Sequence, residues 1–536
     1  MTNSSAGPRR RANDRRSTVG LDAGLVNAID WNTAALRVTH NTQADFAHSP
    51  HYRAIFIHAA EDLIDKARQL LTSGRYSPQL PLTIAVPKPH GFMRPGTILS
   101  PIDRLIYQAV VDVLAPHVEK QLDRARTLSH ILDQDDDTGD MFVSDHESWS
   151  RLQKRIQEMA ASGGYFVKAD IANYFERIPQ HALINLLSAI PNIPPITNLL
   201  EEMLLAFRER DSVGIVQQMY PSDVLGNYFL SDLDAHLDIK GIPSARYVDD
   251  LYLHFPTERA AYAGLADLIA RLRKSQLHLN ESKSGVHTAK DLLMEETELD
   301  LLFASAVEEV EEEQDTFDSM YVSDEWLAEE EEEEEETEES PSIPAITRLF
   351  ESRKHYRRQV DKIDRFCIPF LRAAASPIAV EHCLAGLVSR PYLAKLYSGY
   401  LARLAQADPR VGRKLEALLQ PGILLYESQR MWVMAALLYA TSLDSKTAAL
   451  AVKTLATPSV GQETRAVAAV LAARHGSPAQ RREVRTAYQS EASPYVRAAI
   501  LYSAQYFPTA ERKTCVRAWG GDGDLNPLVC QALATH

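Results

Sequence analysis

The sequence lacks any long apolar run. None of its hydrophobic segments approaches the roughly 20 residues that a membrane-spanning helix requires. The first residues, MTNSSAGPRRRANDRRST, also lack the apolar core of a signal peptide. We therefore expect a cytoplasmic protein that has no membrane partner.

Cysteine is scarce and scattered. The four cysteines, Cys367, Cys383, Cys515 and Cys530, form no CxxC pair and lie beside no histidine cluster. This spacing argues against both a disulfide framework and a zinc site. We expect reduced, buried thiols.

Positive charge is absent from one segment. Residues 304–340 contain nineteen Asp and Glu and no Lys or Arg. The whole chain has a net charge of −15, so the residues outside this segment have a net charge of +4. Five arginines near the N-terminus add a basic arm: Arg9, Arg10, Arg11, Arg15 and Arg16. This distribution is compatible with a partner that bears phosphates.

At 536 residues the chain exceeds one ordinary core, since domains average about 150 residues. We expect a basic N-terminal arm over 1–45, flexible with a short helix near its end or else a disordered tail. A mixed domain over 46–290, an acidic linker over 291–345 and a helical domain over 346–536 should follow.

The mixed region alternates two patterns. PLTIAVP, YFVKADI and SARYVDDLYLHF are typical of strands, whereas HALINLLSAI and YAGLADLIARLRKSQL have helical periodicity. Beyond Ser340 only helical patterns occur, and Arg-led, Ala-rich segments begin at Arg430, Arg465 and Arg497, at spacings of 35 and 32 residues. We expect an α+β fold followed by a HEAT-like α-helical repeat domain, the alternative being a plain helical bundle.

Two adjacent aspartates interrupt the strand pattern ARYVDDLYLHF. The presence of Asp249 and Asp250 in this segment calls for a functional explanation, because aspartate is depleted from strands. At the tip of a hairpin both carboxylates would point toward one place, and carboxylate oxygens are hard ligands that suit Mg²⁺. The alternative for this motif alone is a solvated turn.

A second segment, GGYFVKADIANYFERIP, places Asp170 at the end of another strand pattern. A carboxylate there, beside a hairpin that bears two more, would complete a three-carboxylate nest. Such a nest holds two Mg²⁺ ions for in-line phosphoryl or nucleotidyl transfer.

These residues resemble a reverse transcriptase. Asp170 falls where the family's first catalytic block has its metal ligand, and YVDD, Tyr247 to Asp250, is similar to the family's x-x-Asp-Asp box. The resemblance implies that Asp170, Asp249 and Asp250 bind two Mg²⁺ ions and are catalytic.

The segment GIVQQMYPSDVLGN resembles the family's second block. Gln217, Ser222 and Asn227 match it, whereas Gln218 stands where glycine is usual and Val216 where proline is common. The block lies along the templating base and incoming nucleotide in the family, so the lost glycine puts ordinary template handling in doubt.

The resemblance also implies a nucleotide site. LTIAVPKPHGFMRPG resembles the fingers segment, so Lys88 and Arg94 would grip a deoxynucleoside triphosphate. Lys283 in LHLNESKSGV would contact the triphosphate or protonate the leaving pyrophosphate. Phe175 stands where the family excludes a ribose 2′-hydroxyl, and Gln217 would also contact the nucleotide. The alternatives are surface charge for the cations and a core position for Phe175.

The acidic linker followed by helical repeats resembles bacterial abortive-infection reverse transcriptases, the antiphage group that includes AbiK, AbiA and their unknown-group relatives. That resemblance implies antiphage defence by DNA synthesis without an added template. It also implies oligomers and a DNA product primed on a protein hydroxyl. Tyr220 and Tyr252 are two candidates for the priming residue.

Two alternatives stay open for function. The enzyme would instead copy an RNA template, such as a partner non-coding RNA, or the chain would be a non-catalytic scaffold that binds nucleic acid. For the helical half, oligomerisation is the alternative to work as a polymerase thumb.

Overall fold

The computed structural model describes residues 18–133, 138–191, 193–209, 211–294, 342–356 and 359–535. The five N-terminal arginines and most of the expected acidic linker lie outside the described residues. No helix in the described ranges is both long and apolar enough to cross a membrane.

Five helices build the N-terminal part, before and after a β-hairpin. They are α1 (Ala23–Ala28), α2 (Trp31–Asn41), α3 (Pro50–His58), α4 (Ala60–Thr72) and α5 (Pro101–Glu119). The side chains of Asp22 and Asp30 cap α1 and α2 by accepting backbone N–H bonds. Trp31 and Val38 are buried, so residues 18–45 belong to the folded body, unlike the flexible arm expected over 1–45.

The first sheet is a two-stranded antiparallel hairpin. Strand β1 (Leu82–Pro87) pairs with β2 (Met93–Ile98), and Lys88 N–H closes the connecting loop on the carbonyl of Phe92 at 2.7 Å. Ser100 then caps α5, most of which is buried. The hairpin therefore projects from a rigid helix, with its loop free to face a cavity.

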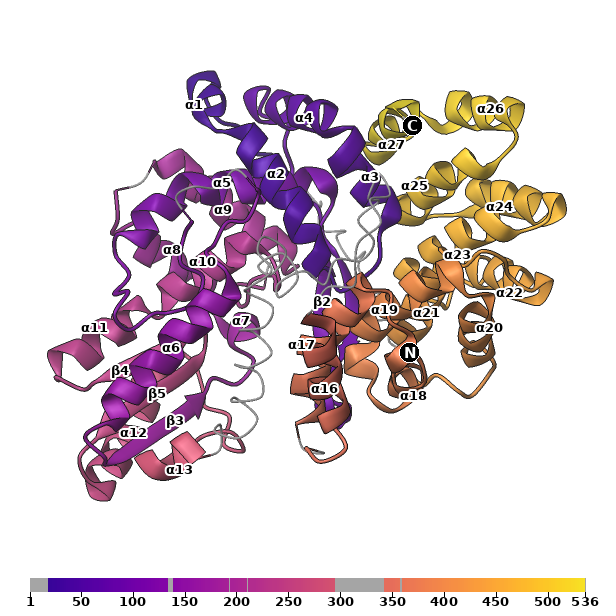
Figure 1. The fold of residues 1–536 in the computed structure, drawn as a ribbon. Coiled ribbons are helices and arrows are strands. Elements are labelled where there is room, and N and C mark those ends of the chain that lie inside the picture. The colour runs from indigo at the N-terminus through magenta and orange to yellow at the C-terminus, as the bar shows by residue number, and fades with distance from the viewer. Residues whose placement is uncertain are drawn as a thin grey trace, which may run out of the picture.

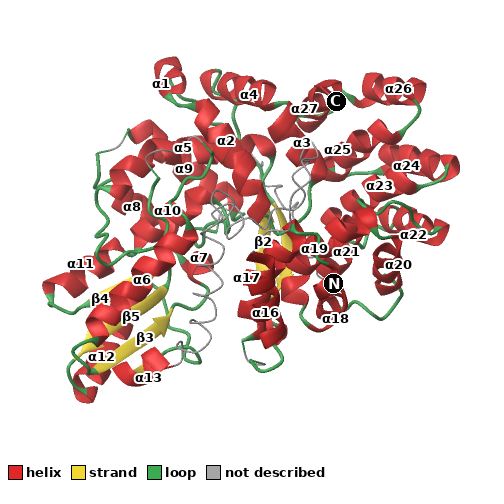
Figure 2. Cartoon of the chain, viewed as in Figure 1, coloured by secondary structure: helices red, strands yellow, loops and turns green. Residues whose placement is uncertain are grey.

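The second sheet has four antiparallel strands in the order β4–β5–β3–β6. Their bounds are Ser244–Tyr247 for β4, Asp250–Phe255 for β5, Tyr165–Asp170 for β3 and Gly285–Thr288 for β6. Helices α6 (Asp145–Ala160) and α12 (Glu258–Lys274) flank it, with α13 (Ala289–Met294) beside β3 and β6 (Figures 1 and 2). Strands β3, β4 and β5 match predicted segments to within a few residues, whereas β6 lies in no segment that was predicted to be a strand.

A group of helices joins this sheet to α5. They are α7 (Tyr174–Arg177), α8 (Gln180–Leu187), α9 (Pro194–Phe207), α10 (Tyr220–Phe229) and α11 (Ser231–Ile239). Both α9 and α10 pack against α5. The segment with the second block, which leads into α10, is thereby packed on the buried helix α5.

The region beyond Ser342 is helical throughout its described residues, as predicted. Its main helices are α16 (Ser342–Ser352), α17 (Val360–Ala373), α18 (Val380–Ser389), α19 (Ala394–Ala407), α20 (Pro409–Leu418), α21 (Glu427–Leu437), α22 (Ser445–Leu455), α23 (Gln462–His475), α24 (Pro478–Ser490), α25 (Pro494–Ser503), α26 (Thr509–Trp519) and α27 (Leu525–Thr535). Each odd-numbered helix from α17 to α27 packs against the next odd-numbered one, so they form an inner row. The HEAT-like assignment of this row stays a prediction.

The alanine-rich pattern explains the inner row. All residues from Ala466 to Ala473 of α23 are buried, because small side chains let α21 and α25 approach from two sides. Cys367, Cys383 and Cys515 are free and buried, as expected, and Cys530 is half-buried.

The C-terminal helices pack on the N-terminal part of the chain. Helices α25 and α27 contact α3, and α21 contacts β1 (Figure 1). Tyr495 Oη hydrogen-bonds Ser49 Oγ at 2.5 Å, and the His51 ring lies edge-on to Tyr495 with centroids 4.6 Å apart. The helical region therefore braces the hairpin side of the molecule.

Candidate active site

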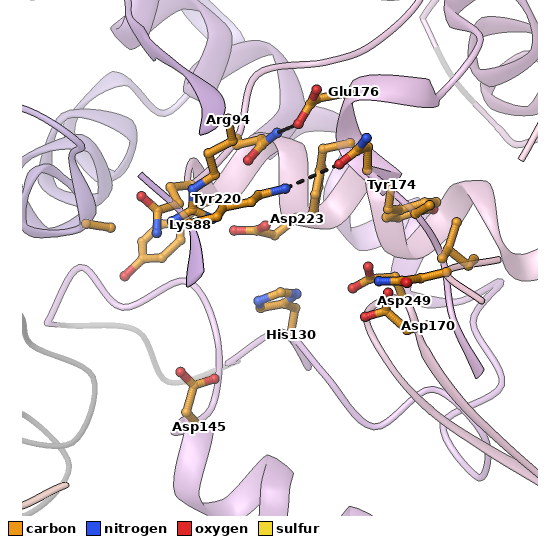
Figure 3. A pocket seen from close by; sticks show the side chains of 18 of the residues that line it. Lys88, Arg94, His130, Asp145, Asp170, Tyr174, Glu176, Tyr220, Asp223 and Asp249 are labelled. Carbon is orange, nitrogen blue, oxygen red and sulfur yellow. Dashed lines mark hydrogen bonds between the residues drawn. The ribbon is translucent and has the colours of Figure 1, made fainter. Parts of the chain in front are cut away.

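One cavity of about 1250 Å³ collects most of the predicted site residues. Its lining includes Lys88, Arg94, Asp170, Phe175, Gln217, Asp249 and Lys283. These side chains come from the hairpin, from the four-stranded sheet and from the segment before α10 (Figure 3). Of the residues predicted to bind metal or nucleotide, Asp250 is the one that does not line the cavity.

The carboxylates sit at the ends of two paired strands. Asp170 ends β3 and is the register partner of Asp250, the first residue of β5, while Asp249 lies in the turn before it. Directly opposed residues of an antiparallel pair point to the same face, so Asp170 and Asp250 lie side by side. Asp249, in the turn, lines the cavity together with Asp170, whereas Asp250 does not.

The turn that carries Asp249 is held in an uncommon conformation. Val248 has a φ of 55°, in the left-handed region that a β-branched residue rarely adopts. Its N–H donates to Ser129 Oγ at 2.9 Å, and its carbonyl accepts from Arg246 at 3.0 Å. These two bonds fix the turn from both sides, as expected where strain is kept at a functional position.

Arg246 anchors this turn from inside the protein. Its side chain is 1% exposed and pairs with Asp234, whose side chain is 4% exposed, at 2.6 Å. It also donates to Asn227 Oδ1 at 3.0 Å and to Thr127 Oγ1 at 2.8 Å. The network ties the aspartate hairpin to α10 and α11. Sequence reasoning missed Arg246, although an arginine within an otherwise apolar strand was a signal.

The carboxylates interact electrostatically. Burial, followed by the charges of Asp250 and Asp170, raises the pKa of Asp249 to about 7. Burial and Asp170 also raise the pKa of Asp250. Such mutual repulsion is typical of carboxylates gathered to bind a cation.

Lys283 supplies a positive charge at this point. Its Nζ lies 3.0 Å from Asp170 Oδ1. Burial alone would lower the pKa of Lys283, but the hydrogen bond to Asp170 and the charges of Asp170, Asp250 and Asp249 raise it. Lys283 is therefore a protonated donor beside the carboxylates.

The three predicted metal ligands lie close enough to repel one another, and their role as a metal site stays a prediction. Within the described ranges, no group of three or more His, Cys, Asp or Glu side chains is arranged to hold one metal ion. Asp170 is paired with Lys283, and Asp250 is exposed and does not line the cavity. Asp170 and Asp249 fit a hard cation best, because both line the cavity and repel each other.

The hairpin brings two cations to the opposite wall. Lys88 Nζ donates to Asn173 Oδ1 at 3.3 Å, and the Arg94 guanidinium lies 4.6 Å from the centre of the Phe46 ring (Figure 3). Burial and the positive charge of Arg365 on α17 lower the pKa of Arg94. The Nε atom of Arg94 is buried without a hydrogen-bond partner, so this wall has capacity to bind an anion.

Phe175 is half-buried in the cavity wall. Behind it lies Gly226 of α10, where an added Cβ would come within 2.9 Å of Phe175 Cε1. The absence of a side chain at Gly226 lets the ring lie close against α10. Phe175 therefore occupies a fixed position on the cavity surface.

The second block keeps its backbone shape despite its altered sequence. Gln218 has a φ of 56°, the left-handed conformation that glycine adopts most easily. Gln217 donates to Glu176 Oε1 at 3.3 Å, and both glutamines line the cavity. The matching Ser222 and Asn227 are buried and bond Tyr107 and Ser129. The missing glycine therefore does not prevent the turn that a glycine would provide.

The two predicted tyrosines lie in different places. Tyr220 lines the cavity, where its hydroxyl lies 2.8 Å from His40 Nδ1 and 3.3 Å from Asp140 Oδ1. Tyr252 is buried in a separate apolar cluster with Phe166 and is not part of the cavity lining. Two further cavity residues escaped the sequence analysis: no motif marks His130, and Asp223 lies within the second block but was given no role.

Sequence comparison bears on this arrangement. Residues 86–318 match the family described as "Reverse transcriptase (RNA-dependent DNA polymerase)". The chain contains a reverse-transcriptase domain. The matched range covers every predicted site residue, from Lys88 to Lys283. A search of curated protein sequences finds no match.

Among solved structures, one similar chain is that of telomerase from Candida albicans in complex with a fragment of telomeric RNA. The two chains are 11% identical, with a TM-score of 0.31, over 66% of this chain and 67% of that one. The reverse-transcriptase domain thus rests on the family match.

Proposed function

We propose that the protein is a Mg²⁺-dependent DNA polymerase of reverse-transcriptase type. The observation that carries this proposal is the joining of Lys88 and Arg94 with Asp170 and Asp249 around one cavity. Cations on one wall suit a triphosphate, and carboxylates on the other suit divalent cations. The family match over 86–318 supports the same chemistry.

Asp170 and Asp249 would hold the metal, with Asp250 adding negative charge from the adjacent position. A bound divalent cation supplies positive charge that activates an attacking hydroxyl and steadies the triphosphate. The electrostatics fit, since the pKa of Asp249 is raised by burial and then by its carboxylate neighbours, a repulsion that a cation relieves.

The chain's own residues would bind and orient the nucleotide. Lys88 and Arg94 bind phosphate oxygens, and Gln217 contacts the nucleotide. In the transfer, the hydroxyl oxygen bonds the α-phosphorus while the bond to pyrophosphate breaks. Lys283 donates a proton to the pyrophosphate, and the hydroxyl proton leaves to solvent.

Phe175 would select the sugar. A rigid aromatic ring on the cavity surface leaves no space for a ribose 2′-hydroxyl, so deoxynucleotides are favoured. The close packing of Phe175 on Gly226 supports this role, because the ring cannot retreat without moving α10.

Priming on a protein hydroxyl is the finer part of the proposal. Of the two candidate tyrosines, Tyr220 is favoured, because its hydroxyl faces the cavity beside His40 and Asp140. Tyr252 is disfavoured by its burial in an apolar cluster. The alternative is copying of an RNA template, which the left-handed turn at Gln218 supports by preserving the shape of the second block.

The proposal also includes a cellular role: the protein would act in antiphage defence, and it would do so as an oligomer. It rests on the helical region that follows the polymerase domain and packs on its hairpin side. Cells that carry the gene should survive phage challenge better than cells that carry the Asp249→Asn variant. Equal survival would remove the defence role.

The test uses purified full-length protein, freed of nucleic acid. It is incubated with Mg²⁺ and labelled deoxynucleotides one at a time, and the products are separated with and without protease. Label that stays with the protein until digestion indicates protein priming, and label that depends on added RNA indicates a templated enzyme. No incorporation in any arm would contradict polymerase function and favour the scaffold alternative.

A further inference from the structure

Asp223 presents an unpaired carboxylate to the cavity. It lies in the first turns of α10 and lines the cavity, where Figure 3 shows it facing the open space below Lys88. Among the described residues its carboxylate has no hydrogen bond or ion pair. Burial raises the pKa of this carboxyl to about 6, so a partner that donates hydrogen bonds would stabilise its ionised form.

The neighbours of Asp223 do not supply that partner. His130 lies across the space from it, and the buried Nδ1 atom of His130 also lacks a partner. Asp145 lines the same wall, but its carboxylate accepts from Tyr247 Oη at 2.8 Å. The wall therefore offers one free acceptor group, Asp223, and one free imidazole nitrogen.

The position of this wall suggests which part of a ligand it meets. Lys88 and Arg94 lie along another side of the cavity, and Asp170 and Asp249 lie at a third (Figure 3). A nucleotide with its phosphates near the cations and carboxylates has its base elsewhere in the cavity. Asp223 and His130 are placed to meet that base.

We propose that Asp223 reads the hydrogen-bonding edge of a nucleobase in this cavity, with His130 beside it. This inference rests on the proposed polymerase function and deepens it. An ionised carboxylate only accepts hydrogen bonds, so it suits a base edge that donates. Guanine presents two adjacent donors, N1–H and the N2 amino group, which a carboxylate accepts in pairs. Thymine offers one donor between two carbonyl oxygens, which the carboxylate repels.

A cation-binding role for Asp223 is less consistent with the geometry. Burial raises the pKa of Asp223, the charge of His130 lowers it and that of Asp145 raises it, so one of its two charged neighbours would repel a cation. Asp223 also lies in the first turn of α10, where a negative charge suits the positive end of the helix, but this interaction uses no hydrogen bond and leaves the carboxylate oxygens open to a ligand. The edge of a base would donate hydrogen bonds to the carboxylate, and the base would fill part of the cavity.

The test compares the full-length protein with Asp223→Asn, which keeps the shape but adds a donor. Incorporation of dGTP and dTTP is measured without a template. We expect the native protein to prefer dGTP and the variant to lower the dGTP-to-dTTP ratio by about tenfold, because one paired contact to a base is worth about 1–3 kcal/mol of discrimination. Asp62→Asn, an exposed change on α4, is the matched control.

Two further arms separate the outcomes. The first arm measures equilibrium binding of dGTP and dTTP to both proteins, so it tests the inference even if neither protein polymerises nucleotides. A lack of polymerisation would contradict the proposed function and not this inference. The second arm measures binding of a strand of six uridines and of the same strand with one guanine. It shows whether Asp223 recognises a base within a strand or the base of a free nucleotide. Guanine preferences that stay unchanged in Asp223→Asn, in both nucleotide and strand binding, would overturn the inference.

Discussion

The buried ion pair of Arg246 and Asp234 should stabilise the conformation of the hairpin that carries Asp249 and Asp250. Replacing Arg246 by methionine leaves the Asp234 carboxylate, 4% exposed, with Thr127 Oγ1 as its remaining side-chain donor at 3.0 Å. Removing one partner of a buried pair costs about 3–5 kcal/mol. The variant also loses the bond that holds the Val248 carbonyl.

Hydrogen exchange of the Ser244–Phe255 hairpin measures this loss. We expect its amides to exchange about 10²- to 10³-fold faster in Arg246→Met, because each 1.4 kcal/mol is a factor of ten. The double variant Arg246→Met/Asp234→Leu should recover much of the protection, since an apolar pair of similar volume replaces a buried ion pair at little cost.

The surface pair of Arg271 and Asp232 provides the control. The side chain of Asp232 is 63% exposed, so Arg271→Met should change stability by less than about 1 kcal/mol. If Arg246→Met accelerated exchange by less than about fivefold, the buried network would not be what holds the turn.

Three further predictions concern single positions. Phe175→Val should raise the use of UTP relative to dTTP by at least about tenfold in a competition assay, and an unchanged ratio would remove the role of the ring. Gln218→Gly should leave the thermal midpoint unchanged or raise stability by about 0.5–1 kcal/mol, because φ is positive there; clear destabilisation would contradict this. Burial, and after it the charge of His48, lowers the pKa of His51 to about 3. In the unfolded chain this histidine binds a proton near pH 6.5, so the free energy of unfolding falls as the pH drops from about 6.5 toward 3. His51→Phe should flatten that fall in acid-unfolding curves, whereas exposed His181→Phe should not.

The strands that carry the aspartates were predictable because their signal is local. A run of β-branched and aromatic residues defines β3 and β5, and Asp170 ends one of them. That Asp249 lies in the turn and Asp250 begins β5 depends on the exact start of the strand, and sequence patterns do not fix a strand end that closely.

Other features depended on tertiary packing. Composition over 1–45 is dominated by the arginines near the start, which hid the apolar stripe of α2 that buries Trp31 and Val38. Asp223 and His130 are 93 residues apart and meet only because α10 packs against α5. No spacing rule in the sequence could bring those two together.

The central claim is that Asp170 and Asp249 act on a nucleotide held by Lys88 and Arg94. The most direct measurement is the rate of labelled deoxynucleotide incorporation by the native protein, Asp170→Asn, Asp249→Asn and the control Asp62→Asn at saturating Mg²⁺. The account predicts a loss of about 10³-fold or more in each of the first two variants and none in the control, since a metal contributes several kcal/mol to such transfers. Incorporation by Asp249→Asn within tenfold of the native rate would contradict it.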